Sequence, residues 1–167
     1  MINNVTILFF LFFVFISSSF AYNKNIEKLI DNYATVEGFS SVKIKEPAKT
    51  LPNMNKQQSN ALKDLLEGVD MIRVLKMDKN KASKEVNEKF SNEVNSFKPG
   101  EGFKELLSVK EAGSFVKMHI KESATKDVTD LLMIAGENSQ ITLIWFNGKL
   151  DLEKIQKSAS ILPKLLK

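Results

Sequence analysis

Two short apolar runs late in the chain constrain the fold more than any other feature of this sequence. The first run is Leu131–Ala135 and the second is Ile141–Phe146. Both are short for helices and are bounded by turn-forming residues, so the pattern predicts two strands. The segment between them, Gly136–Ser139, contains the Gly, Asn and Ser that favour a hairpin turn. The sequence therefore predicts an antiparallel hairpin, followed at Asn147-Gly148 by a turn into a helix.

Both strands of this hairpin are apolar on both faces. Alternation places Leu132, Ile134, Leu143 and Trp145 on one face, and Leu131, Met133, Ile144 and Phe146 on the other. A strand of this kind is usually central in a sheet and covered on both sides. Leaving such side chains in water would forgo about 1.5–3 kcal/mol each, which in sum rivals the net stability of a domain, about 5–15 kcal/mol. We therefore expect both faces to be buried, by the chain's own helices or by a partner.

The N-terminal residues 1–21 have the pattern of a signal peptide. An uninterrupted apolar core ends at Ile16, and the small residues Ser19 and Ala21 occupy the positions that a signal peptidase reads, which predicts cleavage before Tyr22. The segment has no Lys or Arg before its apolar core, unlike the usual signal peptide. An uncleaved membrane anchor is the alternative, although the core is short for a span of about 20 apolar residues. Either reading predicts an exported protein, periplasmic or secreted.

Composition narrows the classes of function. The 167 residues favour one domain, residues 22–167, after the signal peptide. The chain has no cysteine, which excludes disulfides, thiol nucleophiles and thiolate metal sites. The net charge of +4 comes almost wholly from lysine, with Arg73 as the single arginine. Because arginine is preferred for contacts to phosphates and bases, the sequence argues against a nucleic-acid partner.

The remaining periodicities predict the other elements. Helical spacing predicts helices over 25–35, 61–67 and 83–97, and a last helix capped by Asp151. The helix over 83–97 carries an apolar stripe at helical spacing: Ala82, Val86, Phe90, Val94 and Phe97. Alternation predicts strands over 39–45, 69–77, 103–110 and 115–121, with Phe115, Lys117, His119 and Lys121 on the outward face of the last. The strands cluster late and are joined by short turns. The predicted class is α+β: a single, largely antiparallel sheet of about six strands with a C-terminal four-strand meander, and helices packed on it.

Residues that carry chemistry in other proteins are sparse here. A Ser-His-Asp hydrolase would have to use His119, the only histidine, with Ser114 or Ser123 as nucleophile. His119 instead falls among lysines on a predicted strand, and no nucleophile elbow is present. We therefore interpret His119 as a solvated surface residue.

The sequence signals for a metal site, a catalytic carboxylate pair or a phosphate-binding loop are equally weak. One histidine without cysteine excludes the common zinc sites, and Asp127 and Asp130 lack the ligand run of a calcium loop. The pairs Glu101/Glu105 and Asp64/Glu67 have the residue type of a glycosidase site. Each pair lies within one helix or strand, however, and this spacing does not create a cleft. The segment Pro99–Gly102 has no phosphate-loop ending. The sequence therefore assigns no catalytic, cofactor-binding or metal-binding residue.

An apolar ligand site is the last chemical alternative. If a cavity lies between sheet and helices, four apolar side chains would line it: Phe90, Phe97, Leu143 and Trp145. Core packing is the ordinary reading of the same residues.

Four segments carry a resemblance to a known family. They are the stretch Tyr33–Val42, the stretch Leu106–Glu111, the strand Leu131–Gly136, and Gly148–Ile155. In these residues, and over essentially the whole mature chain, the sequence resembles exported proteins of Bacteroidota-type bacteria grouped as domain of unknown function 4252. The resemblance implies export, a small α+β domain, and no assigned activity. The resemblance also implies a gene beside alternative sigma-factor genes, and therefore an envelope-stress setting.

Taken together, these features predict an exported, non-catalytic binding or interaction domain of the bacterial envelope with a protein partner, a signalling accessory being one form of it. The membrane is involved only if the N-terminal segment stays uncleaved, and the prediction includes no cofactor. A carrier of an apolar small molecule and a hydrolase using His119 are the alternatives.

Overall fold

The computed structural model describes residues 23–50, 66–151 and 153–154. The helices are α1 (Lys24–Tyr33), α2 (Pro47–Thr50) and α4 (Lys84–Ser96). The strands are β1 (Phe39–Lys45), β2 (Val69–Asp78), β3 (Phe103–Glu111), β4 (Ser114–Glu122), β5 (Val128–Gly136) and β6 (Gln140–Leu150). The predicted signal segment lies outside the described residues. Within the described ranges, no helix combines the length and the apolar character that a bilayer crossing requires.

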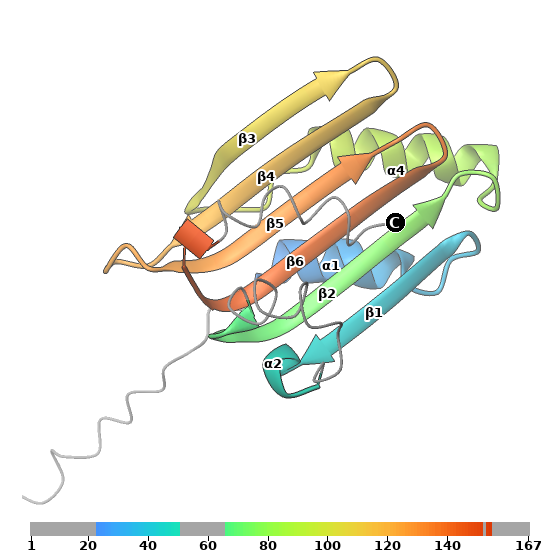
Figure 1. Cartoon of the computed structure of the whole chain (residues 1–167). Coiled ribbons are helices and arrows are strands. Elements are labelled where there is room, and N and C mark those ends of the chain that lie inside the picture. Colours follow the sequence, from blue (N-terminus) through green and yellow to red (C-terminus); the bar gives the residue numbers. More distant parts are fainter. Residues whose placement is uncertain (1–22, 51–65, 152, 155–167) are drawn as a thin grey trace, which may run out of the picture.

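The six strands form one sheet in the order β1-β2-β6-β5-β4-β3, and every neighbouring pair is antiparallel (Figure 1). The predicted α+β class and the C-terminal meander are confirmed. β5 and β6 lie inside the sheet, as their two apolar faces require, whereas β1 and β3 form its two edges. Trp145 pairs with Leu132 across the predicted hairpin.

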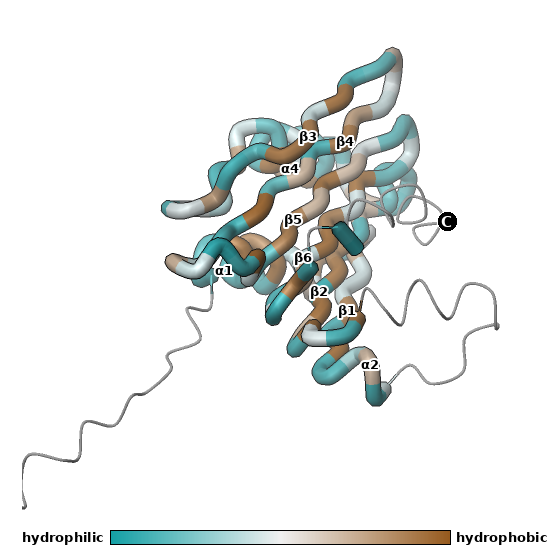
Figure 2. Tube along the Cα trace, turned by 60° about the vertical axis from the view of Figure 1, so that its left-hand side comes forward, coloured by the Kyte–Doolittle hydropathy of each residue, from teal (hydrophilic) through white to brown (hydrophobic). Residues whose placement is uncertain are grey.

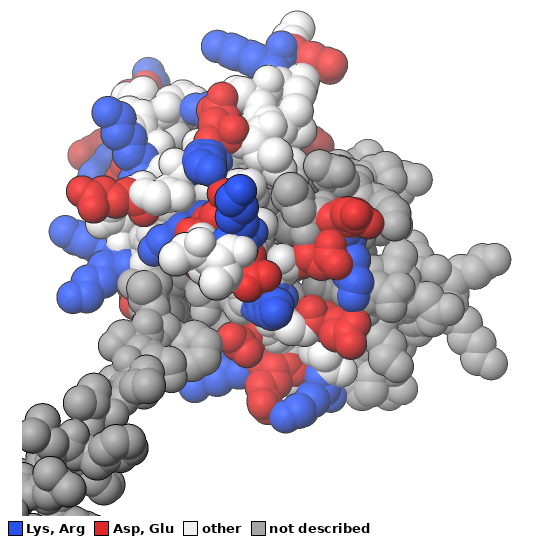
Figure 3. Space-filling view, turned by 90° about the vertical axis from the view of Figure 1, so that its left-hand side faces the viewer, with Lys and Arg blue, Asp and Glu red and all other residues white. Residues whose placement is uncertain are grey.

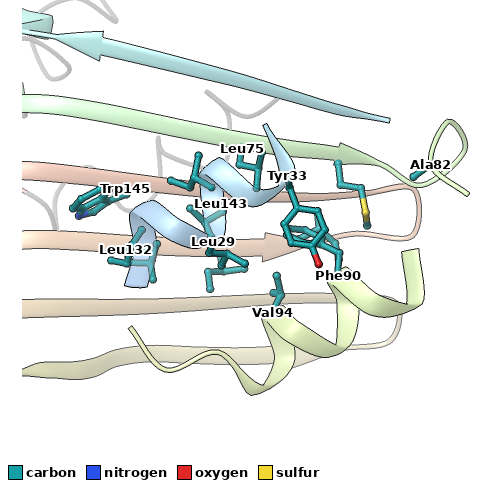
Figure 4. Packing of buried hydrophobic residues seen from close by; sticks show 14 of the residues in the cluster. Leu29, Tyr33, Leu75, Ala82, Phe90, Val94, Leu132, Leu143 and Trp145 are labelled. Carbon is teal, nitrogen blue, oxygen red and sulfur yellow. The ribbon is translucent and has the colours of Figure 1, made fainter. Parts of the chain in front are cut away.

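Helices α1 and α4 pack on one face of the sheet, and their contact with it forms the larger core (Figure 4). Leu132, Leu143 and Trp145 of the sheet are fully buried there, as is Phe90 of α4. The rings of Tyr33, Phe39 and Phe90 meet at centroid distances of 4.7 to 5.0 Å. Aromatic rings at this spacing attract one another beyond their area burial.

Each of these helices begins after a side chain that caps it, Asn23 for α1 and Ser83 for α4. The Asn23 side chain accepts hydrogen bonds from the Asn25 and Ile26 amides at the start of α1. The Ser83 hydroxyl accepts one from the Val86 amide at the start of α4. Such caps satisfy amides that have no partner within a helix. The apolar stripe predicted for residues 83–97 faces the sheet, with Phe90 and Val94 buried.

The single arginine ties α1 to the sheet. Arg73 of β2 is 5 % exposed, and its Nη2 donates to Asp31 Oδ1 of α1 at 2.6 Å. Its Nη1 lies 3.7 Å from Glu27 Oε1, one helical turn earlier. Two carboxylates therefore balance one buried cation, which is the condition for tolerating a charge in a core.

The opposite face of the sheet carries a second core. Its strand residues Leu131, Met133, Ile144 and Phe146 are between 0 and 6 % exposed, so the expected burial of both faces is confirmed. Figure 2 shows the corresponding hydrophobic colouring along β5 and β6. Of the predicted helices 61–67 and 151 onward, only short parts fall in the described residues. Asp151 Oδ1 accepts from the Glu153 and Lys154 amides, as the predicted cap requires.

One sequence prediction is wrong at the end of β6. Asn147-Gly148 was expected to form a turn into a helix, but the strand continues through both residues to Leu150. Gly148 has φ +141, and a side chain there would collide with the Gly68 carbonyl and the Asp70 amide. The glycine therefore allows β2 to approach closely rather than ending the strand.

Candidate interaction surface

The large apolar side chains that the described residues leave in solvent gather on the edge strands. Val42 of β1 is 49 % exposed, and on β3 Leu106, Leu107 and Val109 are 38, 41 and 42 % exposed. β3 ends the sheet, so its outer backbone groups face away from β4, and no other described strand pairs with them (Figure 1). An edge that combines open backbone groups with apolar side chains is a natural place for another chain to bind.

A β-bulge shapes this edge. Glu105 lies opposite His119 of β4, and Leu107 lies opposite Met118, so Leu106 is an extra residue in β3. Met118 belongs to the second core, which places Leu107 and Val109 beside that face of the sheet. The apolar strip of β3 therefore extends the second face outward, beyond the point where it is buried.

Four charged residues flank the strip: Lys104, Glu105, Lys110 and Glu111. Lys104 Nζ donates to Glu122 Oε2 at 2.7 Å, although its own side chain remains 68 % exposed. All four residues are exposed, so each side chain can meet a further partner.

The sequence pattern alone does not reveal this strip. The available signal was topological: the first strand of a terminal meander has a neighbour on one side only, unless a distant strand joins it. Leu106, Leu107 and Val109 look like core residues when the strand is considered alone, because sequence periodicity does not distinguish an edge from the interior.

His119 occupies a different environment from the one predicted. Its side chain is 13 % exposed instead of solvated, because its face of β4 lies beneath the helix layer. Lys117, on the same face, donates to the Asn95 carbonyl of α4 at 3.1 Å, and Phe115 packs against the larger core. Nδ1 of His119 is buried and has no hydrogen-bond partner among the described residues, and Nε2 lies 3.9 Å from Glu105 Oε2. Burial lowers the pKa of His119 below 6.5, Glu105 opposes this shift and Lys117 adds to it.

The two serines considered as nucleophiles do not reach His119. Ser114 and Ser123 lie five and four positions along the chain from it, at opposite ends of the extended strand. At about 3.3 Å per residue, these separations are on the order of 13 Å or more. The Ser123 hydroxyl is instead 2.9 Å from that of Thr125. The geometry therefore argues against a hydrolase triad around His119.

The carboxylates considered as glycosidase or calcium residues also stay apart. Glu105 faces His119, Asp127 accepts from the Thr125 hydroxyl at 2.9 Å, and Glu67 pairs with Lys154 at 2.9 Å. Asp64 lies outside the described residues, and Glu101 is exposed in the turn before β3. In the part of the chain that the structure covers, no three acidic or histidine side chains converge as a metal site would need.

Asp130 is the one buried carboxylate in this set. It is 1 % exposed and accepts hydrogen bonds from Trp145 Nε1 at 2.9 Å and Asn147 Nδ2 at 3.0 Å, with the Thr129 hydroxyl at 3.1 Å. Burial raises the pKa of Asp130, and these hydrogen bonds act in the opposite direction. Its position explains its role: Asp130 satisfies the indole N–H of the largest buried side chain.

The four side chains proposed to hold an apolar ligand are part of the core. Phe90, Leu143 and Trp145 are fully buried in it, and Phe97 packs against it at the end of α4. Phe90 contacts the rings of Tyr33 and Phe39. Core packing accounts for all four.

Charged side chains of both signs are intermingled on the face in Figure 3. A surface hollow of about 430 Å³ near the start of β5 follows the same pattern. Two of its lysines pair with acidic residues of the same hollow: Lys149 lies 4.0 Å from Asp127, and Lys154 lies 2.9 Å from Glu67. The mixture resembles an ordinary solvated surface rather than a site for a polyanion.

Replacing Asp130 with Ala should destabilise the protein by about 1–3 kcal/mol, because the Trp145 indole N–H would be buried without its acceptor. Asp70→Ala is the control, since Asp70 is exposed on β2, and it should change stability by no more than about 0.5 kcal/mol. Urea unfolding followed by circular dichroism measures both. Equal effects of the two substitutions would contradict the assigned role.

The His119 imidazole should titrate with a midpoint below 6.5, because burial disfavours its charged form. Since its pKa is lower in the folded than in the unfolded chain, its contribution to stability is present above pH 6.5 and is lost as pH falls through the folded pKa. NMR titration of this single histidine measures the midpoint, and His119→Gln should lack the acid loss. A midpoint at or above 6.5 would overturn the assignment.

Comparison with known protein families finds a match over most of the chain. The model of a protein family described as "Domain of unknown function (DUF4252)" matches residues 33–158, a range that includes every strand of the sheet. Searches of curated proteins and of solved structures returned no match. Because the matched range covers most of the chain, the protein belongs to the DUF4252 family, a domain of unknown function.

Proposed function

We propose that this protein is an exported, non-catalytic interaction domain of the bacterial envelope, and that it binds a protein partner along the β3 edge. The single observation that carries the proposal is the apolar strip of Leu106, Leu107 and Val109 beside the open backbone of an edge strand.

Strand addition is the mode of binding that suits this surface. An added strand would bond to the outer amides and carbonyls of β3, while its side chains would cover the apolar strip. β3 has nine residues, so the addition would extend over several backbone hydrogen bonds. Main-chain bonds supply affinity in this mode, and side chains supply selectivity.

The charges on β3 restrict which strand can pair with this edge. Lysines and other charged residues on an edge discourage unselective pairing between sheets. Lys104 and Glu105 lie at one end of the strip, and Lys110 and Glu111 at the other. A partner strand would have to match this pattern as well as the apolar centre, which restricts the choice of partner.

The envelope location in this proposal rests on the N-terminal segment. Its apolar core and the small residues Ser19 and Ala21 support export and cleavage before Tyr22. The chain has no cysteine, so its folding needs no disulfide and is compatible with an oxidising compartment outside the cytoplasm. The family resemblance favours a signalling accessory as the particular form of this role.

Photo-cross-linking in the native host tests the proposal. The full-length chain would carry benzoylphenylalanine in place of Leu107, and the control would carry it in place of Val42. Both positions are exposed and apolar, but they lie on opposite edges of the sheet. The Leu107 variant should give a discrete adduct in the envelope fraction, and the Val42 variant should not.

Three results would count against the proposal. They are the lack of any adduct from Leu107, an equal adduct from Val42, and retention of the unprocessed chain in the cytosol. The mass of the adduct also identifies whether the partner is another protein or a second copy.

A further inference from the structure

We infer that the chain that binds at β3 is a second copy of this protein, paired antiparallel through β3 about a two-fold axis at Ser108. This inference rests on the proposed function, because it names the partner for the same surface. The two six-stranded sheets would join into one continuous sheet across the dimer.

Symmetry restricts which residues can face each other in such a pair. A two-fold axis perpendicular to two antiparallel strands places one residue opposite its own copy. It also keeps each side chain on its own face of the joined sheet. Any two residues that meet across the axis must therefore lie on the same face of β3.

The bulge in β3 places residues of opposite charge on the same face of the strand, as this symmetry requires. Lys104 and Glu111 lie opposite Ile120 and Ser114, which share one face of β4. In an unbroken strand Lys104 and Glu111, seven positions apart, would point to opposite faces. The extra residue, Leu106, shifts the alternation by one and places both on the same face.

The bulge also places Glu105 and Lys110 on one face of β3. Glu105 and Lys110 lie opposite His119 and Phe115 of β4, and these two residues share the other face. On each face, β3 therefore presents one lysine and one glutamate near its two ends.

An axis at Ser108 makes the strand complementary to itself. With Glu105 and Leu106 counted together as one bulged position, Lys104 meets Glu111 of the second copy, and Glu105 meets Lys110 of the second copy. Leu107 meets Val109 of the second copy on the face that carries the apolar strip. Symmetry repeats each pair, so every charge on the strand faces an opposite charge. Opposite charges and apolar residues are the favourable cross-strand neighbours.

Neighbouring registers lose this match. An axis at Leu107 would place Lys104 opposite Val109 and Glu105 opposite Ser108, without an ion pair. An axis at Val109 would place Leu107 opposite Glu111. The pattern of charges therefore selects one register.

The charged side chains of β3 remain accessible to a second copy despite their contacts within the chain. Lys104 and Glu105 already meet Glu122 and His119 on the inner side, towards β4, yet their side chains are 68 and 53 % exposed. The opposite edge of the sheet differs: β1 carries Lys43 and Lys45 and no carboxylate. No self-pairing of β1 yields an ion pair, so the complementarity belongs to β3.

Two charge variants of the full-length chain, produced in a host that exports it, test the inference by sedimentation. Glu105→Lys with Glu111→Lys makes all four charges of β3 positive, and Lys104→Glu with Lys110→Glu makes all four negative. The wild type should be a dimer, each variant alone a monomer, and their equimolar mixture a heterodimer. Lys43→Glu with Lys45→Glu on β1 makes the same change in net charge as the negative variant and should leave the dimer intact.

A cysteine variant tests the register directly and does not depend on the charge variants folding. The native chain has no cysteine, so Ser108→Cys introduces the only thiol. Residues directly opposite on antiparallel strands have Cα atoms about 4.5–5.5 Å apart, within the range of a disulfide. Ser108→Cys should therefore form a covalent dimer on oxidation. In Lys110→Cys the two thiol-bearing residues would be on the order of 13 Å apart along the strands, and this control should remain uncoupled.

A monomeric wild type, homodimers of either charge variant, a monomeric mixture, or no disulfide through Ser108→Cys would each overturn the inference. None of these results decides the proposed function, which the cross-linking experiment tests separately. An adduct of Leu107 with a different protein would support the proposed function while excluding the second copy. The lack of any adduct would remove both.

Discussion

The structure depends on one constraint: the central strands are apolar on both faces, so each face must be kept from water. Leu132 and Trp145 are buried under α1 and α4, while Leu131 and Phe146 are buried on the opposite side. Burial of this kind is the main favourable term in folding. The same constraint explains why a carboxylate is buried beside Trp145, since the indole N–H must keep an acceptor once it leaves water.

This constraint does not apply to the edges of the sheet, and the large apolar side chains that the described residues leave exposed lie there. At β3 the protein leaves apolar side chains and backbone groups open, and it surrounds them with charges of both signs. The bulge at Leu106 orders these charges by face. In the proposed pairing, this local irregularity allows a charged edge strand, which would otherwise discourage association, to match one specific partner. We propose binding to another chain as the activity of this arrangement.

Much of the fold follows from periodicity, but the environment of single residues does not. The opposite faces of the central hairpin and the stripe around Phe90 were predicted, because burial there depends on local alternation. The burial of His119 was missed, because it depends on α4 packing over β4. The strand continuing through Gly148 was missed because a close approach to β2 cannot be read from one strand. The β3 strip was missed because edge position is a property of the whole sheet.

Hydrogen exchange measured residue by residue tests the central claim most directly. If burial on both faces of the central strands holds the domain together, amides of β5 and β6 exchange only when the whole domain unfolds. They should then be the slowest in the protein, on the order of a hundredfold slower than the most protected amides of edge strand β1. Exchange of β6 amides as fast as those of β1 would show that the centre opens independently, and would contradict the account.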